Sequence, residues 1–152
     1  MAGIIVALDT TDTDKARAWA AATAPHVGLF KIGLEYFLAN GTAGYRAIEG
    51  RPIFLDVKLH DIPTTVRKAA AVAGALGAKY LTMHAQGGSD MLQAGVQGLY
   101  DGARNAGLAQ PTAVAITVLT SDPNAPPHIV PHRLRMAVEA GCTGIVCSGP
   151  SL

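Results

Sequence analysis

The chain has 152 residues, 49% of them hydrophobic and 15% charged, and a formal net charge of +1. These values are typical of one compact domain, residues 1–152, and exclude a disordered or fibrous protein. With 5% aromatic residues, no basic tract and only short apolar runs, neither a nucleic acid polymer nor a membrane is an expected partner.

Strand-like and helix-like segments alternate along the whole sequence. Short apolar runs predict strands at Ile4–Leu8, Leu29–Ile32, Ile53–Lys58, Tyr80–His84, Thr112–Leu119 and Gly144–Cys147. Helical patterns lie between them, at Thr13–Ala22, Glu35–Asn40 with Gly44–Glu49, Thr64–Leu76, Met91–Ala106 and Arg133–Ala140. A glycine suited to a left-handed cap follows three of these helices, at Gly77, Gly107 and Gly141. Apolar strands separated by helices predict a parallel α/β sheet.

Polar side chains collect at the ends of several predicted strands: Asp9, Lys31, Asp56 with Lys58, His84, and Thr117 with Thr120. No strand is followed by a glycine-rich turn of the dinucleotide-binding or P-loop type, so nucleotide binding of those types has no support. A site assembled from many strand ends is typical of the (β/α)₈ barrel. Of these residues, His84 is expected to be structural, because a histidine in such a place needs only a satisfied hydrogen bond.

The most informative stretch runs from Asp56 to Pro63, at the end of a buried strand. Asp56 and Lys58 are two positions apart, so on a strand their side chains point to the same side. Asp61 follows on the loop, from which it could approach the same place. A carboxylate, an ammonium and a second carboxylate at a strand's carboxyl end suit proton chemistry. The alternative is a structural ion pair with a nearby helix cap, although a buried pair seldom repays its desolvation.

Four motifs of the sequence, Val6–Asp9, Phe30–Gly33, Asp56–Pro63 and Val118–Ser121, together resemble the bacterial type of the orotidine 5′-phosphate decarboxylase family. They occur in the family's order, and Gly144–Ser148 looks like the sixth strand of the same fold. The resemblance implies the α/β fold of the (β/α)₈ TIM-barrel family, with about six of the eight β/α units present. It also implies decarboxylation of orotidine 5′-phosphate to uridine 5′-phosphate in pyrimidine biosynthesis.

The resemblance implies a catalytic set of Lys58, Asp56, Asp61 and Lys31. Lys58 would protonate C6 of the pyrimidine as carbon dioxide leaves, while Asp56 would lie beside the substrate carboxylate. Lys31 would hold Asp56 and a ribose hydroxyl. The family needs no metal and no organic cofactor, so none is expected.

The resemblance also implies the residues that bind the substrate. Asp9 and Lys31 would bind the ribose, Asp56 would face the carboxylate, and Thr120 would touch the pyrimidine edge. Asp61, Ile62 and Thr65 would reach into the site of a neighbouring subunit, so a homodimer with shared sites is expected.

Other readings of the sequence stay open. Sister families with sugar-phosphate decarboxylase or hexulose-phosphate synthase activity share the Asp-x-Lys-x-x-Asp element but use magnesium, and they place an acid where this chain has Lys31. A full barrel needs about 200 residues or more, with phosphate usually held after strands seven and eight. The chain is therefore expected to be C-terminally incomplete, and an inactive barrel fragment is the second alternative. His128 and His132 are four apart, but Pro131 and the lack of a third ligand argue against a metal site.

Two further features bear on the compartment. Cys142 and Cys147 are too few for a disulfide framework and are expected to be reduced. The sequence also enters its first apolar run without a basic leader or a cleavage site, so we expect a cytoplasmic protein.

Overall fold

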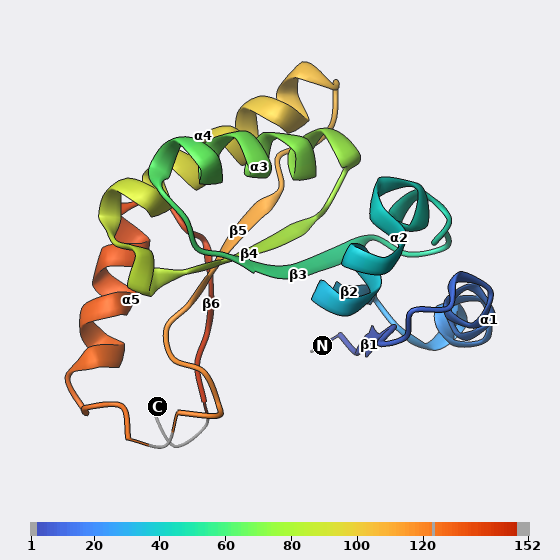
Figure 1. Ribbon diagram of the computed structural model, residues 1–152, viewed down its shortest axis with the longest axis horizontal. Coiled ribbons are helices and arrows are strands. Elements are labelled where there is room, and N and C mark those ends of the chain that lie inside the picture. The colour runs from blue at the N-terminus through green and yellow to red at the C-terminus, as the bar shows by residue number, and fades with distance from the viewer. Residues whose placement is uncertain (1–2, 123, 149–152) are drawn as a thin grey trace.

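Six strands form a single parallel sheet whose spatial order is the order of the chain. The computed structural model describes residues 3–122 and 124–148. In order, the strands are β1 (Ile5–Ala7), β2 (Leu29–Gly33), β3 (Ile53–Leu59), β4 (Tyr80–His84), β5 (Thr112–Ile116) and β6 (Gly144–Val146). The sheet curves, and the helices lie on its outer side (Figure 1). The predicted parallel barrel-type sheet is therefore confirmed.

Helices follow each of the first five strands. Their bounds are α1 (Thr13–Thr23), α2 (Leu34–Arg46), α3 (Pro63–Leu76), α4 (Ser89–Asn105) and α5 (Ile129–Glu139), with short 3₁₀ turns at Ala24–His26 and Ala85–Gly87. Asp12 caps α1, since its side chain accepts a hydrogen bond from the Lys15 amide at 3.0 Å. The predicted left-handed glycines are confirmed, with φ of 88° at Gly77, 71° at Gly107 and 98° at Gly141. None of the helices in the described ranges has the length and apolar character to cross a membrane.

The structure differs from the predicted elements at several boundaries, of which α5 shows a large one, since it begins at Ile129 instead of Arg133. α2 is broken at Gly41, whose φ is 60°, in agreement with the two predicted helical segments, but it ends at Arg46 instead of Glu49. β5 ends at Ile116 instead of Leu119; the Thr117 amide still donates to the Val146 carbonyl of β6, while the Thr117 carbonyl accepts a hydrogen bond from Arg133. α3 begins at Pro63, one residue before the predicted Thr64, with proline at its first position and no side-chain hydrogen bond at its N-cap.

The hydrophobic core fills the space between the sheet and its helices. Its largest fully buried side chains include Phe30 and Ile32 of β2, Tyr36 of α2, and Leu81 and Met83 of β4. Burial of each such side chain stabilises the fold by about 1.5–3 kcal/mol. Because side chains alternate along a strand, Leu81 and Met83 face the helices and the remaining side chains of β4 face the inside of the curved sheet. The candidate site lies on that inner face.

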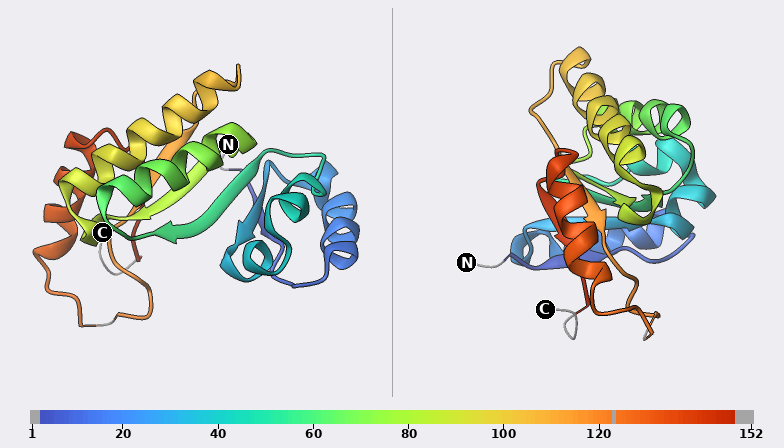
Figure 2. Two further views of the ribbon diagram at one scale, coloured as in Figure 1. Left: turned by 45° about the horizontal axis from the view of Figure 1, so that its top comes forward. Right: turned by 90° about the vertical axis from the view of Figure 1, so that its left-hand side faces the viewer.

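Helices α3 and α4 pack closely against each other, running side by side over the sheet (Figure 2). Glycines make this approach possible. A Cβ atom at Gly74 would collide with the backbone of Leu99, one at Gly98 with the carbonyl of Arg67, and one at Gly102 with the carbonyl of Ala71. This close packing fixes α3, whose first residues follow the loop that carries Asp61.

Candidate active site

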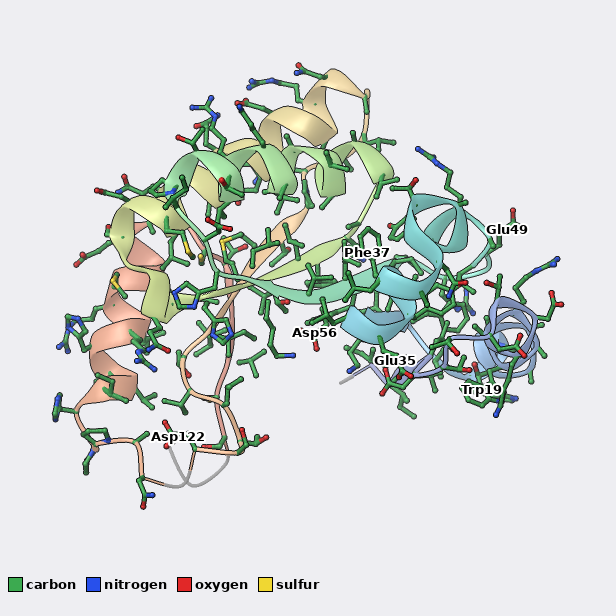
Figure 3. The ribbon with its side chains drawn as sticks, in the orientation of Figure 1. Trp19, Glu35, Phe37, Glu49, Asp56 and Asp122 are labelled. Carbon is green, nitrogen blue, oxygen red and sulfur yellow. The ribbon has the colours of Figure 1, made fainter. Side chains whose placement is uncertain are left out.

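The predicted charged residues meet at the carboxyl ends of β2 and β3. Asp56 is the central residue of β3 and Lys58 lies near the strand's carboxyl end; the register partner of Asp56 on β2 is Gly33, two residues after Lys31. Figure 3 shows the Asp56 side chain pointing away from α3 and α4, which places it on the inner face of the sheet. Parallel strands bring their carboxyl ends to one edge, and this common edge is where barrel enzymes assemble their sites.

Asp56 is held by two lysines. Its carboxylate accepts hydrogen bonds from the Lys58 ammonium at 2.9 Å and 3.0 Å, and Lys31 Nζ lies 3.6 Å from Oδ2. The Asp56 side chain is 13% exposed, whereas Lys31 and Lys58 are 31% and 38% exposed. The carboxylate is thus nearly enclosed while both ammonium groups stay open to a ligand. The predicted meeting of Asp56, Lys58 and Lys31 is confirmed as geometry.

The backbone at Lys58 is unusual. Lys58 has a φ of 49° and is the non-glycine residue with positive φ in the part of the chain that the structure describes. The register of β3 against β4 shifts here, since Leu55 pairs with Leu81 and Leu59 with Met83, so β3 advances four residues while β4 advances two. Left-handed backbone costs a side-chain-bearing residue about 1–2 kcal/mol, and such outliers cluster at functional sites. Strand alternation alone therefore does not explain why Lys58 meets Asp56.

Thr82 of β4 connects the two residues. Its hydroxyl accepts a hydrogen bond from the Lys58 amide at 2.9 Å and lies 2.9 Å from Asp56 Oδ1, to which it donates. Thr82 is fully buried. Sequence reasoning did not identify this residue, because a threonine inside an apolar strand resembles a core position. The available signal was its place two residues before His84, which puts both side chains on the same face of β4.

The surroundings of Asp56 favour its charged form. Burial alone would raise the pKa of this carboxyl, but hydrogen bonds from Lys58 and Thr82 and the charges of Lys58 and Lys31 outweigh burial. The pKa of Asp56 therefore lies below its ordinary value, and the residue is a carboxylate near neutral pH. Asp56 is therefore a fixed anion beside the two cations Lys31 and Lys58.

Two histidines and an arginine lie near the lysines. The rings of His60 and His84 have centroids 5.4 Å apart, and Arg133 of α5 donates a hydrogen bond to the Thr117 carbonyl at 2.6 Å. Burial lowers the pKa of His84, and the positive charges of His60, Lys58 and Arg133 lower it further. A group of cations around one carboxylate suits an anionic ligand. Neither His60 nor Arg133 was among the predicted site residues.

The other predicted site residues do not join the ion pairs of this cluster within the described chain. Asp9 lies at the end of β1, with its Oδ1 3.3 Å from where a Cβ of Gly33 would stand. Asp61 is exposed and accepts a hydrogen bond from the Ile62 amide at 2.6 Å. The remaining three, Ile62, Thr65 and Thr120, are exposed as well. These positions leave their assigned roles as predictions.

A strongly curved parallel sheet with a lysine–carboxylate cluster at its carboxyl edge defines a protein of the β/α-barrel class. Residues 3–151 match the sequence model described as the Orotidine 5′-phosphate decarboxylase / HUMPS family. The chain belongs to this family.

Individual relatives agree with the family match. A protein named orotidine 5′-phosphate decarboxylase from Anaeromyxobacter sp. (strain K) is 48% identical, with 95% of this chain and 66% of that protein covered. The protein of the same name from Paramagnetospirillum magneticum is 43% identical, with 95% and 67% covered. The crystal structure of orotidine 5′-phosphate decarboxylase from Lactobacillus acidophilus superposes with a TM-score of 0.82 at 32% identity, over 96% of this chain and 71% of that one. The chain thus spans about two thirds of the length of the curated relatives it matches.

Proposed function

We propose that the protein decarboxylates orotidine 5′-phosphate to uridine 5′-phosphate in pyrimidine biosynthesis, without a metal or an organic cofactor. The observation that carries the proposal is the Lys58 ammonium, held by Asp56 beside Lys31 at the barrel mouth. Membership of the Orotidine 5′-phosphate decarboxylase / HUMPS family supports it.

The reaction needs a group that is first a cation and then a proton donor. When the bond between C6 and the carboxylate breaks, carbon dioxide leaves and the electron pair stays on C6 as a localised carbanion. Lys58 can stabilise that charge and then transfer a proton from Nζ to C6, which gives the product. The Asp56 carboxylate keeps Lys58 protonated, since opposite charges about 4 Å apart attract by roughly 4 kcal/mol at an effective dielectric of 20.

Asp56 has a second part in the proposed reaction. It is a carboxylate near neutral pH and would lie beside the carboxylate of the bound substrate, so the two anions repel each other. The product has lost that group and is not repelled. An interaction that disfavours the bound substrate relative to the transition state raises the rate of the chemical step.

We assign the remaining substrate contacts as follows. Lys31 and Asp9, at the ends of β2 and β1, would bind the ribose hydroxyls, and Thr120, after β5, would touch the pyrimidine edge. The cations near His84 provide a favourable field for a substrate that carries both a carboxylate and a phosphate.

We infer that the enzyme is a homodimer in which Asp61, Ile62 and Thr65 complete the partner's site. Ile62 is 66% exposed, and the Asp61 carboxylate accepts a hydrogen bond from the Ile62 amide instead of from Lys58. An exposed isoleucine beside an exposed acid at the mouth of the barrel suits a surface that a second subunit covers. A two-fold axis would make the exchange of residues reciprocal.

A magnesium-dependent sister activity is less compatible with the charges. Lys31 and Lys58 both lie against Asp56, and two ammonium groups repel a divalent cation from the carboxylate that would bind it. We place the enzyme in the cytoplasm, a compartment suited to its two free thiols, Cys142 and Cys147, the first of which burial holds protonated with a pKa of about 11.

The decisive experiment is to add orotidine 5′-phosphate to the purified chain, in the presence of a chelator, and to follow the loss of substrate absorbance. Conversion to uridine 5′-phosphate is the expected result. Activity on a sugar phosphate that depends on added magnesium would favour the sister activity instead. Binding of the nucleotide without conversion would identify an inactive barrel fragment.

A further inference from the structure

Thr82 connects β4 to the Asp56–Lys58 pair by hydrogen bonds. It is fully buried, and its hydroxyl lies 2.9 Å both from the Lys58 amide nitrogen and from Asp56 Oδ1. A hydroxyl has one hydrogen to donate. The Lys58 amide can only donate, so the Thr82 hydrogen is directed to the carboxylate. The direction of both hydrogen bonds is therefore fixed.

These two bonds act on different parts of the pair. One holds the backbone of Lys58, and the other holds the side chain of Asp56. Lys58 needs such support because its φ of 49° is unfavourable for a residue with a side chain. The support comes where the pairing of β3 with β4 changes register, between Leu55 and Leu59. Where the regular strand pairing is lost, the buried Thr82 hydroxyl holds the Lys58 backbone by a hydrogen bond.

Lys31 cannot take over the two hydrogen bonds of Thr82. It approaches Asp56 from the other side, from β2, and its Nζ lies 3.6 Å from Oδ2, whereas Thr82 bonds to Oδ1. Besides the two hydrogen bonds from the Lys58 ammonium, the carboxylate thus has a short hydrogen bond from Thr82 at Oδ1 and a longer contact with Lys31, a flexible cation, at Oδ2. Of these two groups, only Thr82 also contacts Lys58.

We propose that Thr82 is a positioning residue of the active site, which sets the geometry of Asp56 and Lys58 toward the substrate without touching the substrate itself. The part of this proposal that concerns turnover rests on the proposed decarboxylase function. The part that concerns the Asp56–Lys58 geometry does not. A misplacement of about 1 Å in a catalytic group can cost about 10²-fold in rate.

Three variants of the purified chain test the kinetic part. Thr82→Val keeps the shape but removes both hydrogen bonds, Thr82→Ser keeps the hydroxyl, and Thr112→Val makes the same change at the far end of the neighbouring strand β5. We expect kcat for orotidine 5′-phosphate to fall about 10²-fold in Thr82→Val with KM little changed. Thr82→Ser and Thr112→Val should stay close to the wild type. Equal kcat in Thr82→Val and wild type would overturn the proposal.

A titration provides a second measurement that does not need turnover. The pKa of the Asp56 carboxyl can be followed by carbon NMR in the same variants, with circular dichroism to confirm folding. Thr82→Val should raise this pKa, because the charged form loses a hydrogen bond, and Thr82→Ser should restore it. An unchanged pKa in Thr82→Val would refute the positioning role even if the wild type fails to turn over orotidine 5′-phosphate, an outcome that would contradict only the proposed function.

Discussion

Lys31 on β2 approaches Asp56 on β3 to 3.6 Å, although the strand register places Asp56 opposite Gly33. The lysine therefore reaches along the sheet, two residues up, to meet the carboxylate. Position 33 has little room for a side chain, since a Cβ there would lie 3.3 Å from Asp9 Oδ1. Asp56 thus has one cation from its own strand and one from the next. Removal of either lysine leaves the buried carboxylate with a partner.

Lys58→Ala should abolish most of the turnover without loss of product binding. Removal of a group that protonates the reacting carbon lowers kcat by about 10²–10⁴-fold. Affinity for uridine 5′-phosphate should be largely unchanged, because Lys58 acts mainly on the transition state and Asp56 keeps Lys31. Steady-state kinetics and calorimetric titration measure the two quantities. Lys79→Ala, at the opposite end of the sheet, is the control, and near-normal kcat in Lys58→Ala would mean that the proton donor is another residue.

Mixing two inactive variants should restore activity. If Asp61 serves the partner's site, a heterodimer of a Lys58→Ala and an Asp61→Ala subunit contains one site with both changes and one with neither. Random exchange makes about half of the dimers mixed, so about a quarter of wild-type activity is expected. The measurement is turnover after subunit exchange, with exchange verified by mass spectrometry of labelled subunits. No recovery despite exchange would show that Asp61 acts within its own chain.

Glycine at position 58 should give a more stable protein than alanine. The left-handed φ of 49° costs alanine about 1–2 kcal/mol, whereas glycine adopts it freely and loses about 0.5–1 kcal/mol through its more flexible unfolded chain. Lys58→Gly should therefore exceed Lys58→Ala by about 0.5–1 kcal/mol in the free energy of unfolding, measured with urea. At the neighbouring Val57 the order should reverse. The same order at both positions would argue against the strained backbone.

The stability of the protein at acid pH should depend on the ionised Asp56 carboxylate. Its pKa lies below the ordinary value, which the unfolded chain keeps near 4, so its contribution to stability is complete above that value. As the pH falls, the unfolded chain takes up the proton first, and the contribution is lost until the pH is below the pKa in the folded protein. Urea unfolding between pH 3 and 7 should therefore show a steeper loss in the wild type than in Asp56→Asn. Asp122→Asn, in an exposed loop, is the control and should keep the wild-type slope.

The parallel sheet and the charged pair could be predicted because both depend on short-range patterns. Apolar runs separated by helices leave few arrangements other than a parallel sheet. Asp56 and Lys58 are two positions apart, and residues with this spacing lie on the same side of a regular strand. Asp56 and Lys58 do meet, but not through strand alternation alone. Strand alternation does not describe a residue with the φ of Lys58, and no pattern in the sequence marks that conformation.

The remaining features depend on contacts between distant residues. Thr82 lies 26 residues after Asp56, and its role becomes visible only when β3 and β4 are paired. The early end of β5 has a similar origin, since Val118 and Leu119 continue the apolar run, but Arg133 bonds to the Thr117 carbonyl. Local propensity cannot include a hydrogen bond from a helix that comes later in the chain.

The order of the strands in the sheet has a consequence for synthesis. Each strand pairs with the strands directly before and after it in the chain, so every pairing can close as soon as the next β/α unit has left the ribosome. Lys31, Asp56, Lys58 and Thr82 all lie on β2, β3 and β4. The strands that carry the charged cluster can therefore pair while β5 and β6 are still being translated.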